Sequence, residues 1–188
     1  MFFKRHQILF WCLLIYSWEQ RKLSTGLTKY INRVYVDDDK SYKQISVKNN
    51  FGGISLRKII RGKDIGRKRQ SKIDLASYPN TLIFTRQTIE QGGIGWASTD
   101  VDEAIVTENM PTLSLNKNVF SKYFLNSLFQ TETFYKKCIL DNITGGSAQI
   151  AIHEDNLLKS VLPLPPIDEQ EKVGSLLQDV ENVITLHR

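Results

Sequence analysis

The feature that most constrains the fold is a proline-rich segment near the C-terminus, Leu162–Pro166, with acidic residues directly after it. Its three prolines exclude a helix, because each fixes φ, lacks an N–H donor and restrains the residue before it. Asp168, Glu169 and Glu171 then place negative charge where a helix dipole is positive. We therefore predict an extended strand that leads into a helix beginning directly after Pro166.

Apolar residues on this predicted helix recur at the spacing of a narrow helix–helix seam. The seam consists of Val173, Leu176, Val180 and Val183, and Leu177 and Ile184 widen it on one side. His187 takes the next position of the repeat. Two heptads leave two interpretations open: an amphipathic helix packed on its own domain, or a rod that docks on a second helix.

Length and composition favour one globular domain with an appendage. The chain has 188 residues, of which 41% are hydrophobic and 24% charged, as in ordinary globular domains. Cys12 and Cys138 lie far apart, which suits a reducing compartment better than a disulfide scaffold. The histidines are scattered as well, so the sequence predicts neither a metal site nor a cofactor.

The net charge of +5 is concentrated in one run, from Arg57 to Lys72. This run holds eight basic residues against the single acid Asp64, a local balance of +7, so the rest of the chain carries −2. Such a concentration is typical of a protein that binds a polyanion. We expect the run to form a basic loop in which Gly62 and Gly66 let the backbone approach a phosphate.

Alternating and continuous apolar patterns predict a mixed set of strands and helices. Strands are expected over 30–36, 42–47, 81–85, 104–107 and 112–115, and helices over 120–129 and 132–140. Arg86 and Gln87 directly follow the strand at 81–85, and these side chains are suited to hydrogen-bonding guanine and adenine edges. A turn satisfied by local hydrogen bonds is the alternative for this pair.

The N-terminal segment resembles a secretion signal in part. A basic start, Met1–His6, precedes an apolar run, Ile8–Tyr16, that is too short to span a bilayer as a helix. Bulky residues follow where a signal cleavage site needs small ones. Three interpretations are open: secretion or anchoring, a buried element, and an atypical start to a domain that otherwise begins near Trp18.

Three segments together resemble a known family. The segment from Leu162 to Val173 closely resembles the junction in type I restriction-modification specificity subunits, where a Pro-Pro-hydrophobic-x-Glu-Gln pattern leads into a long helix. Trp18–Leu23 is similar to the opening of a target recognition domain in that family. Gly145–Ile152 is similar to the Gly-rich turn and strand near its end. The resemblance spans roughly residues 18–188.

The resemblance implies an α/β (mixed α+β) target recognition domain over 18–165, followed by a long amphipathic spacer helix over 166–188, with 1–17 as an atypical N-terminal segment. Such a chain would be half of a specificity subunit and would read one half of a bipartite target on double-stranded DNA. The implied partners are a methyltransferase (modification) subunit, a restriction subunit, and a second half-subunit or copy docked through the helix. A cytoplasmic location is expected.

The residues suggest how these roles divide. We expect phosphate contacts from Lys63, Arg67, Lys68 and Arg69, base contacts from Arg86 and Gln87, and a helix interface from Val173, Leu176, Leu177, Val180, Val183 and Ile184. The sequence has no Asn-Pro-Pro-aromatic motif and no Gly-rich loop for a methyl donor, so we expect a non-catalytic chain. The alternatives are a small secreted or membrane-associated protein and a specificity-subunit fragment without function.

Overall fold

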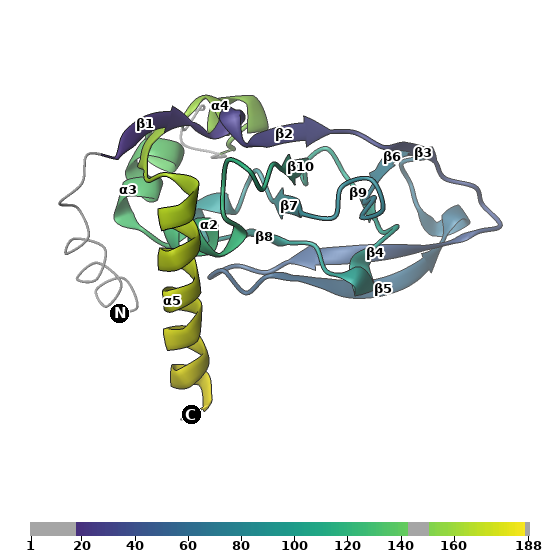
Figure 1. The fold of residues 1–188 in the computed structure, drawn as a ribbon. Helices are drawn as coiled ribbons and strands as arrows, with labels where there is room; N and C mark the ends of the chain where they lie inside the picture. The colour runs from purple at the N-terminus through teal and green to yellow at the C-terminus, as the bar shows by residue number, and fades with distance from the viewer. Residues whose placement is uncertain (1–17, 143–150, 187–188) are drawn as a thin grey trace. The chain divides into compact units, whose positions relative to one another are not determined.

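The computed structural model describes residues 18–142 and 151–186, with side chains as far as Ile184 (Figure 1). The predicted segment 1–17, most of the Gly-rich stretch 145–152 and His187 lie outside the described residues. Contacts divide the chain into two compact units. Unit 1 takes the described residues of 1–26, 116–143 and 155–188, and unit 2 those of 27–115 and 144–154. This division differs from the predicted boundary at 165/166, because the C-terminal helix groups with unit 1.

Unit 2 contains a four-stranded antiparallel sheet in the order β2-β10-β7-β8. Its strands are β2 (Leu27–Tyr30), β7 (Thr81–Phe84), β8 (Ile94–Trp96) and β10 (Thr112–Leu115). Every residue of β7 is buried, which agrees with its prediction as a continuous apolar strand. The glycine-containing residues 91–93 form a turn into β8, with Gly92 at a φ of 78°.

Unit 2 also contains a five-stranded sheet in the order β3-β6-β9-β4-β5. Its strands are β3 (Arg33–Tyr35), β4 (Ser41–Val47), β5 (Ile54–Arg61), β6 (Arg69–Lys72) and β9 (Ile105–Val106). A buried cluster joins the two sheets, since it includes Ile83 of β7 together with Ile45 of β4 and Val106 of β9. A second cluster of Val36, Ile65 and Ile105 packs against Val34 of β3.

Two predictions for this region were wrong in detail. The basic run is not one loop, because β5 carries its first part and β6 its last part. The strand predicted over 30–36 is interrupted after Tyr30, so that β2 and β3 join different sheets. Gly62 is buried rather than open to a phosphate. A Cβ at this position would lie 1.8 Å from the Asp37 carbonyl oxygen, so close backbone packing explains the glycine.

Unit 1 combines one strand pair with the helices. Strand β1 (Glu19–Lys22) pairs antiparallel with β11 (Val161–Leu164), the predicted proline-rich strand. The helices are α2 (Lys122–Phe129), α3 (Glu132–Phe134), α4 (Glu154–Lys159) and α5 (Ile167–Leu186). Helix α3 continues as a wider turn over Tyr135–Ile139. The predicted helices at 120–129 and 132–140 and the helix start after Pro166 are confirmed.

Gln170 connects α5 to the start of α2. Its side chain is completely buried. Its Oε1 accepts a hydrogen bond from the Ser121 amide at 3.1 Å, and its Nε2 donates to the carbonyls of Pro165 at 2.9 Å and Val119 at 3.3 Å. The glutamine of the Glu-Gln pair thus satisfies one donor at the α2 N-terminus, one buried carbonyl and one partly buried carbonyl.

Further contacts fix the first half of α5 on α2. A Cβ at Gly174 would lie 2.6 Å from the amide nitrogen of Phe124, so the two helix backbones approach closely there. The indole of Trp18 donates to Glu169 at 3.2 Å and meets the ring of Phe124 edge to face, with centroids 6.1 Å apart. Trp18 and Glu169 come from two of the segments that resemble the family, so both segments help to pack α5 on α2.

The apolar stripe of α5 divides into two groups. Val173 and Leu177 are buried in unit 1. Leu176, Val180, Val183 and Ile184 are exposed, with 37–55% of their surface accessible. Packing on its own unit holds for Val173 and Leu177, so the predicted interface is corrected for these two residues. Docking on a second helix stays a prediction for the exposed residues. Among the described residues, no helix has the length and apolar character needed to cross a membrane.

Candidate nucleic-acid interface

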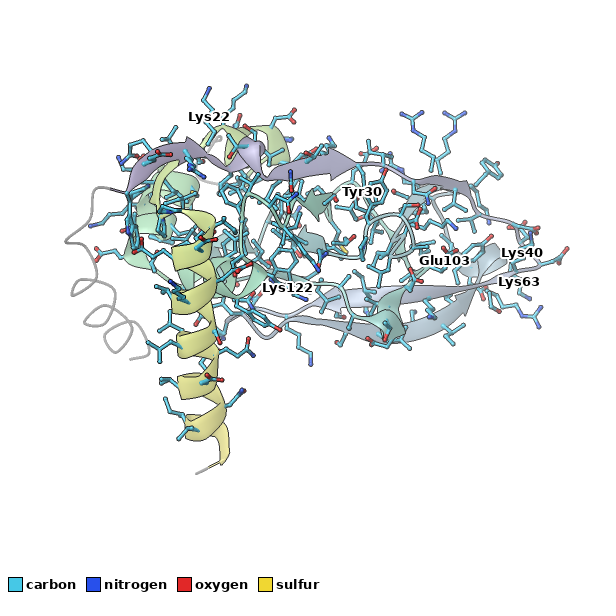
Figure 2. The ribbon with its side chains drawn as sticks, viewed as in Figure 1. Lys22, Tyr30, Lys40, Lys63, Glu103 and Lys122 are labelled. Atoms are coloured by element: carbon cyan, nitrogen blue, oxygen red, sulfur yellow. The ribbon has the colours of Figure 1, made fainter. Side chains whose placement is uncertain are left out.

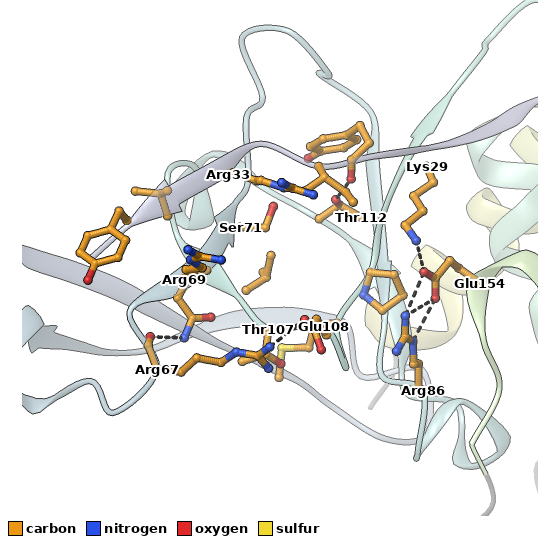
Figure 3. A pocket seen from close by; sticks show the side chains of 18 residues that line it. Lys29, Arg33, Arg67, Arg69, Ser71, Arg86, Thr107, Glu108, Thr112 and Glu154 are labelled. Carbon is orange, nitrogen blue, oxygen red and sulfur yellow. Dashed lines mark hydrogen bonds and ion pairs between the residues drawn. The ribbon is translucent and has the colours of Figure 1, made fainter. Parts of the chain in front are cut away.

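Unit 2 has a hollow with a volume of about 700 Å³ on its basic side (Figure 3). Residues of β2, β3 and β6 line it together with the segments that follow β7 and β9. Five basic side chains line the hollow, Lys29, Arg33, Arg67, Arg69 and Arg86, against two acidic ones, Glu108 and Glu154. Because the basic groups outnumber the acidic ones, the hollow attracts anions.

Glu154 organises one side of the hollow. Only 3% of its side chain is exposed, and the guanidinium of Arg86 forks onto both of its oxygens at 2.6–2.9 Å. Lys29 bonds the same carboxylate. Burial alone would raise the pKa of Glu154, but hydrogen bonds from Lys29 and Arg86 outweigh it and hold this pKa below its usual value.

The ion cluster of Lys29, Arg86 and Glu154 lies beside a contact that holds the backbone before α4. Arg86 is the second residue after β7, and its carbonyl accepts a hydrogen bond from the Ile152 amide at 3.0 Å. The segment before α4 is therefore attached to the end of β7 by one backbone bond and one buried ion pair. A buried carboxylate with bidentate arginine pairing is well satisfied, and removing one partner would leave a costly unpaired charge.

Other cations of the basic run also have acidic partners. Arg67 contacts Glu108 at 2.8 Å, and both side chains are mostly exposed. Lys68 bonds Asp38 and donates to the Gly62 carbonyl at 2.8 Å. Surface pairs of this kind are weak, and solvent and salt screen them further. They reduce the local excess of positive charge without burying it.

Arg33 and Arg69 differ from these cations. Within the described part of the chain, neither guanidinium has an acidic or hydrogen-bonding partner, and both side chains are exposed. Antiparallel pairing of β3 with β6 sets Arg33 opposite Ser71 and Tyr35 opposite Arg69. These four residues share one face of the strand pair, because side chains alternate along a strand. Tyr35 on this face is 70% exposed.

The structure separates the predicted site residues. Arg67, Arg69 and Arg86 line the hollow, whereas Lys68 and Gln87 do not. Lys63 lies beyond the end of β5, where its amide donates to the Asp38 carbonyl at 3.2 Å (Figure 2). Arg86 and Gln87 lie in different surroundings, because Glu154 holds the guanidinium of Arg86, whereas Gln87 is exposed outside the hollow.

Lys29 and Arg33 line the hollow but were not predicted as site residues. Both lie outside the basic run on which the charge argument rested. Arg33 could have been found from the sequence, because Arg33 and Tyr35 alternate with Val34 and Val36. This alternation predicts one polar, exposed face on that strand. Among the residues described, no group of three or more histidine, cysteine, aspartate or glutamate side chains is arranged to hold a metal ion.

Comparison with solved structures finds the same fold. The crystal structure of the HsdS subunit from Thermoanaerobacter tengcongensis matches with a TM-score of 0.71 and 18% identity, over 92% of this chain and 44% of that one. A chain from a structure described as the basis of complex assembly and conformational transition of the type I R-M system matches with a TM-score of 0.66 and 20% identity, over 90% of this chain and 44% of that one.

The chain thus spans less than half the length of these structural relatives. Comparison with curated protein sequences gives no significant match. The family model described as "Type I restriction modification DNA specificity domain" matches residues 18–188, which is most of the chain. The expected mixed α/β fold with a long C-terminal helix is also confirmed. This chain therefore belongs to the family of type I restriction modification DNA specificity domains.

Proposed function

We propose that this chain is a DNA-recognition subunit that reads one half of a bipartite duplex target with the basic hollow of unit 2. The observation that carries the proposal is the exposed face of β3 and β6. There Arg33 and Arg69, which have no acidic partner among the described residues, and exposed Tyr35 border a hollow with excess positive charge. A two-stranded ribbon fits the DNA major groove, which is about 12 Å wide. Neighbouring strands lie only about 4.8 Å apart.

Phosphate contacts are proposed for Lys63, Arg67 and Lys68. The carboxylate partners of Arg67 and Lys68 are exposed, so a phosphate can replace them at small cost. Lys63 is itself exposed beyond the end of β5. Arg86, expected from the sequence to contact a base, has a different role in this proposal. Because its guanidinium already forks onto buried Glu154, we assign it to holding the floor of the hollow rather than to direct base contact. Gln87 is exposed and retains its proposed role at a base edge.

The partners follow from the exposed part of α5. Leu176, Val180, Val183 and Ile184 offer an apolar strip for a second helix, supplied by another copy or by another specificity chain. A pair of identical copies would favour an inverted-repeat target, because an isologous contact carries a two-fold axis. In this proposal the methyltransferase and restriction subunits supply the catalysis, and this chain supplies recognition.

Duplex binding measured by fluorescence anisotropy over a range of salt concentrations tests the proposal. Each phosphate contact contributes about 0.9 to the slope of log K against log salt, so replacing Lys63, Arg67 and Lys68 together by alanine should lower the slope by up to about 2.7. The control removes the same charge from β5, with Arg57→Ala, Lys58→Ala and Arg61→Ala. Strand β5 is the edge strand opposite β3 in the sheet order. Equal slopes for the wild type and the first variant would contradict the proposed phosphate contacts.

A further inference from the structure

We propose that Arg33 and Arg69 determine the sequence specificity of this chain, each by forking onto one guanine in the major groove. The inference rests on the proposed function, because it needs a duplex seated on the face of β3 and β6. It goes further by naming which residues read bases and which base they select. Neither residue was distinguished in this way by the charge pattern of the sequence.

The first step is the difference in partners among the cations of the hollow. Arg86 and Lys29 are held by Glu154, and Arg67 contacts Glu108 (Figure 3). Among the residues that the structure describes, Arg33 and Arg69 are the two cations lining the hollow without an acidic partner. All five donor N–H groups of each guanidinium are therefore available to a ligand.

The second step is the spacing of the two arginines. Arg33 lies opposite Ser71, and Arg69 lies opposite Tyr35, so the two are diagonal neighbours on one face. Diagonal neighbours on adjacent strands are about 7–8 Å apart. Bases along one strand of DNA rise about 3.4 Å per step. The pair is thus spaced to reach bases about two steps apart.

The third step is the rigid support behind this face. Strand β6 pairs with β9, and Val34 of β3 packs against the buried cluster of Val36, Ile65 and Ile105. Sites on strands hold side chains more reproducibly than sites on loops, which base reading requires. Because the backbones of β3 and β6 are fixed in register, Arg33 and Arg69 cannot shift independently along a DNA groove.

The fourth step distinguishes base edges from phosphates. Tyr35, 70% exposed, and Ile31, 55% exposed, line the same hollow as the two arginines and offer apolar surface. Apolar surface suits the thymine methyl groups and base edges of the major groove, whereas phosphate contacts need only donors and charge. Guanine presents two acceptors, N7 and O6, that match the arginine fork. Lysine carries a single flexible ammonium without this planar fork, so replacing arginine by lysine at a bidentate site is not conservative.

The test is selection of the full chain on a library of duplexes with a randomised centre, followed by sequencing of the bound fraction. The variants are Arg33→Lys and Arg69→Lys, which keep the charge and remove the fork. The control is Arg57→Lys on exposed β5. In each variant, the preference for guanine over the other bases should fall by about 5- to 150-fold at one position of the target. The preferences at the other positions should stay the same. The control should select the wild-type sequence.

Three results would overturn the inference, and they differ from one another. An unchanged consensus with weaker binding to every duplex would show that the arginines contact phosphates, while the proposed function stands. Loss of a preference for A·T pairs rather than guanine would show minor-groove reading. Failure of the wild type to select any sequence would remove the proposed function together with the inference. Thermal unfolding of each variant checks that the fold is intact.

Discussion

Replacing Gln170 by alanine tests the packing of α5 most sharply. The side chain is fully buried and makes three hydrogen bonds, to the Ser121 amide and to the carbonyls of Pro165 and Val119. A typical hydrogen bond contributes about 1 kcal/mol to stability, so the three together contribute about 3 kcal/mol. For a chain of this length, a loss of that size lowers Tm by roughly 6–12 °C.

Calorimetry or circular dichroism measures this change, and Gln178→Ala provides the matched control. Gln178 carries the same amide on the same helix but is only half-buried, and its side chain has no hydrogen-bonding partner in the part of the chain that the structure describes. Its replacement should change the free energy of unfolding by no more than about 0.5 kcal/mol. If Gln170→Ala unfolds within about 2 °C of the wild type, the three bonds do not stabilise the junction and the reasoning is refuted.

Three other predictions follow from the same contacts. Gly174→Ala should lower Tm despite the better helix propensity of alanine, because its Cβ would meet the amide nitrogen of Phe124 at 2.6 Å; an unchanged or raised Tm would contradict this contact. Glu154 has a lowered pKa in the fold, so it stabilises the protein above its unfolded pKa and this contribution disappears as pH falls through the lowered value. Glu154→Gln should therefore lower Tm at neutral pH and make Tm fall less as the pH is lowered. Melting curves over a series of pH values would measure both effects. Leu176→Glu with Val183→Glu should abolish self-association in sedimentation experiments without lowering Tm, since both side chains are about half exposed; a monomeric wild type would contradict pairing of identical copies.

The sequence predicted the C-terminal part of the fold well, because its signals are local. Prolines exclude helix wherever they occur in such a density, and the acidic residues after Pro166 define a helix start without help from tertiary contacts. The buried strand β7 was likewise visible as a short apolar run. The role of Gln170 was not predictable in this way, since its three partners lie on segments that only tertiary packing brings together.

The candidate site was only partly predictable. The basic run drew attention to Arg67 and Arg69, yet sheet pairing distributes that run between β5 and β6 at separate positions of the sheet. Arg33 and Arg69 are far apart in the sequence, and the pairing of β3 with β6 places them on one face. Arg86 stood out by its place after a strand, but the sequence contained no sign that Glu154, 68 residues later, would occupy its guanidinium.

Hydrogen–deuterium exchange of the full chain with and without a bound duplex tests the central claim directly. If the face of β3 and β6 binds DNA, amide protection should rise over 31–35 and 67–72, while β5 and the exposed face of α5 remain unchanged. Protection confined to β5 or to α5, with none on β3 and β6, would contradict the account.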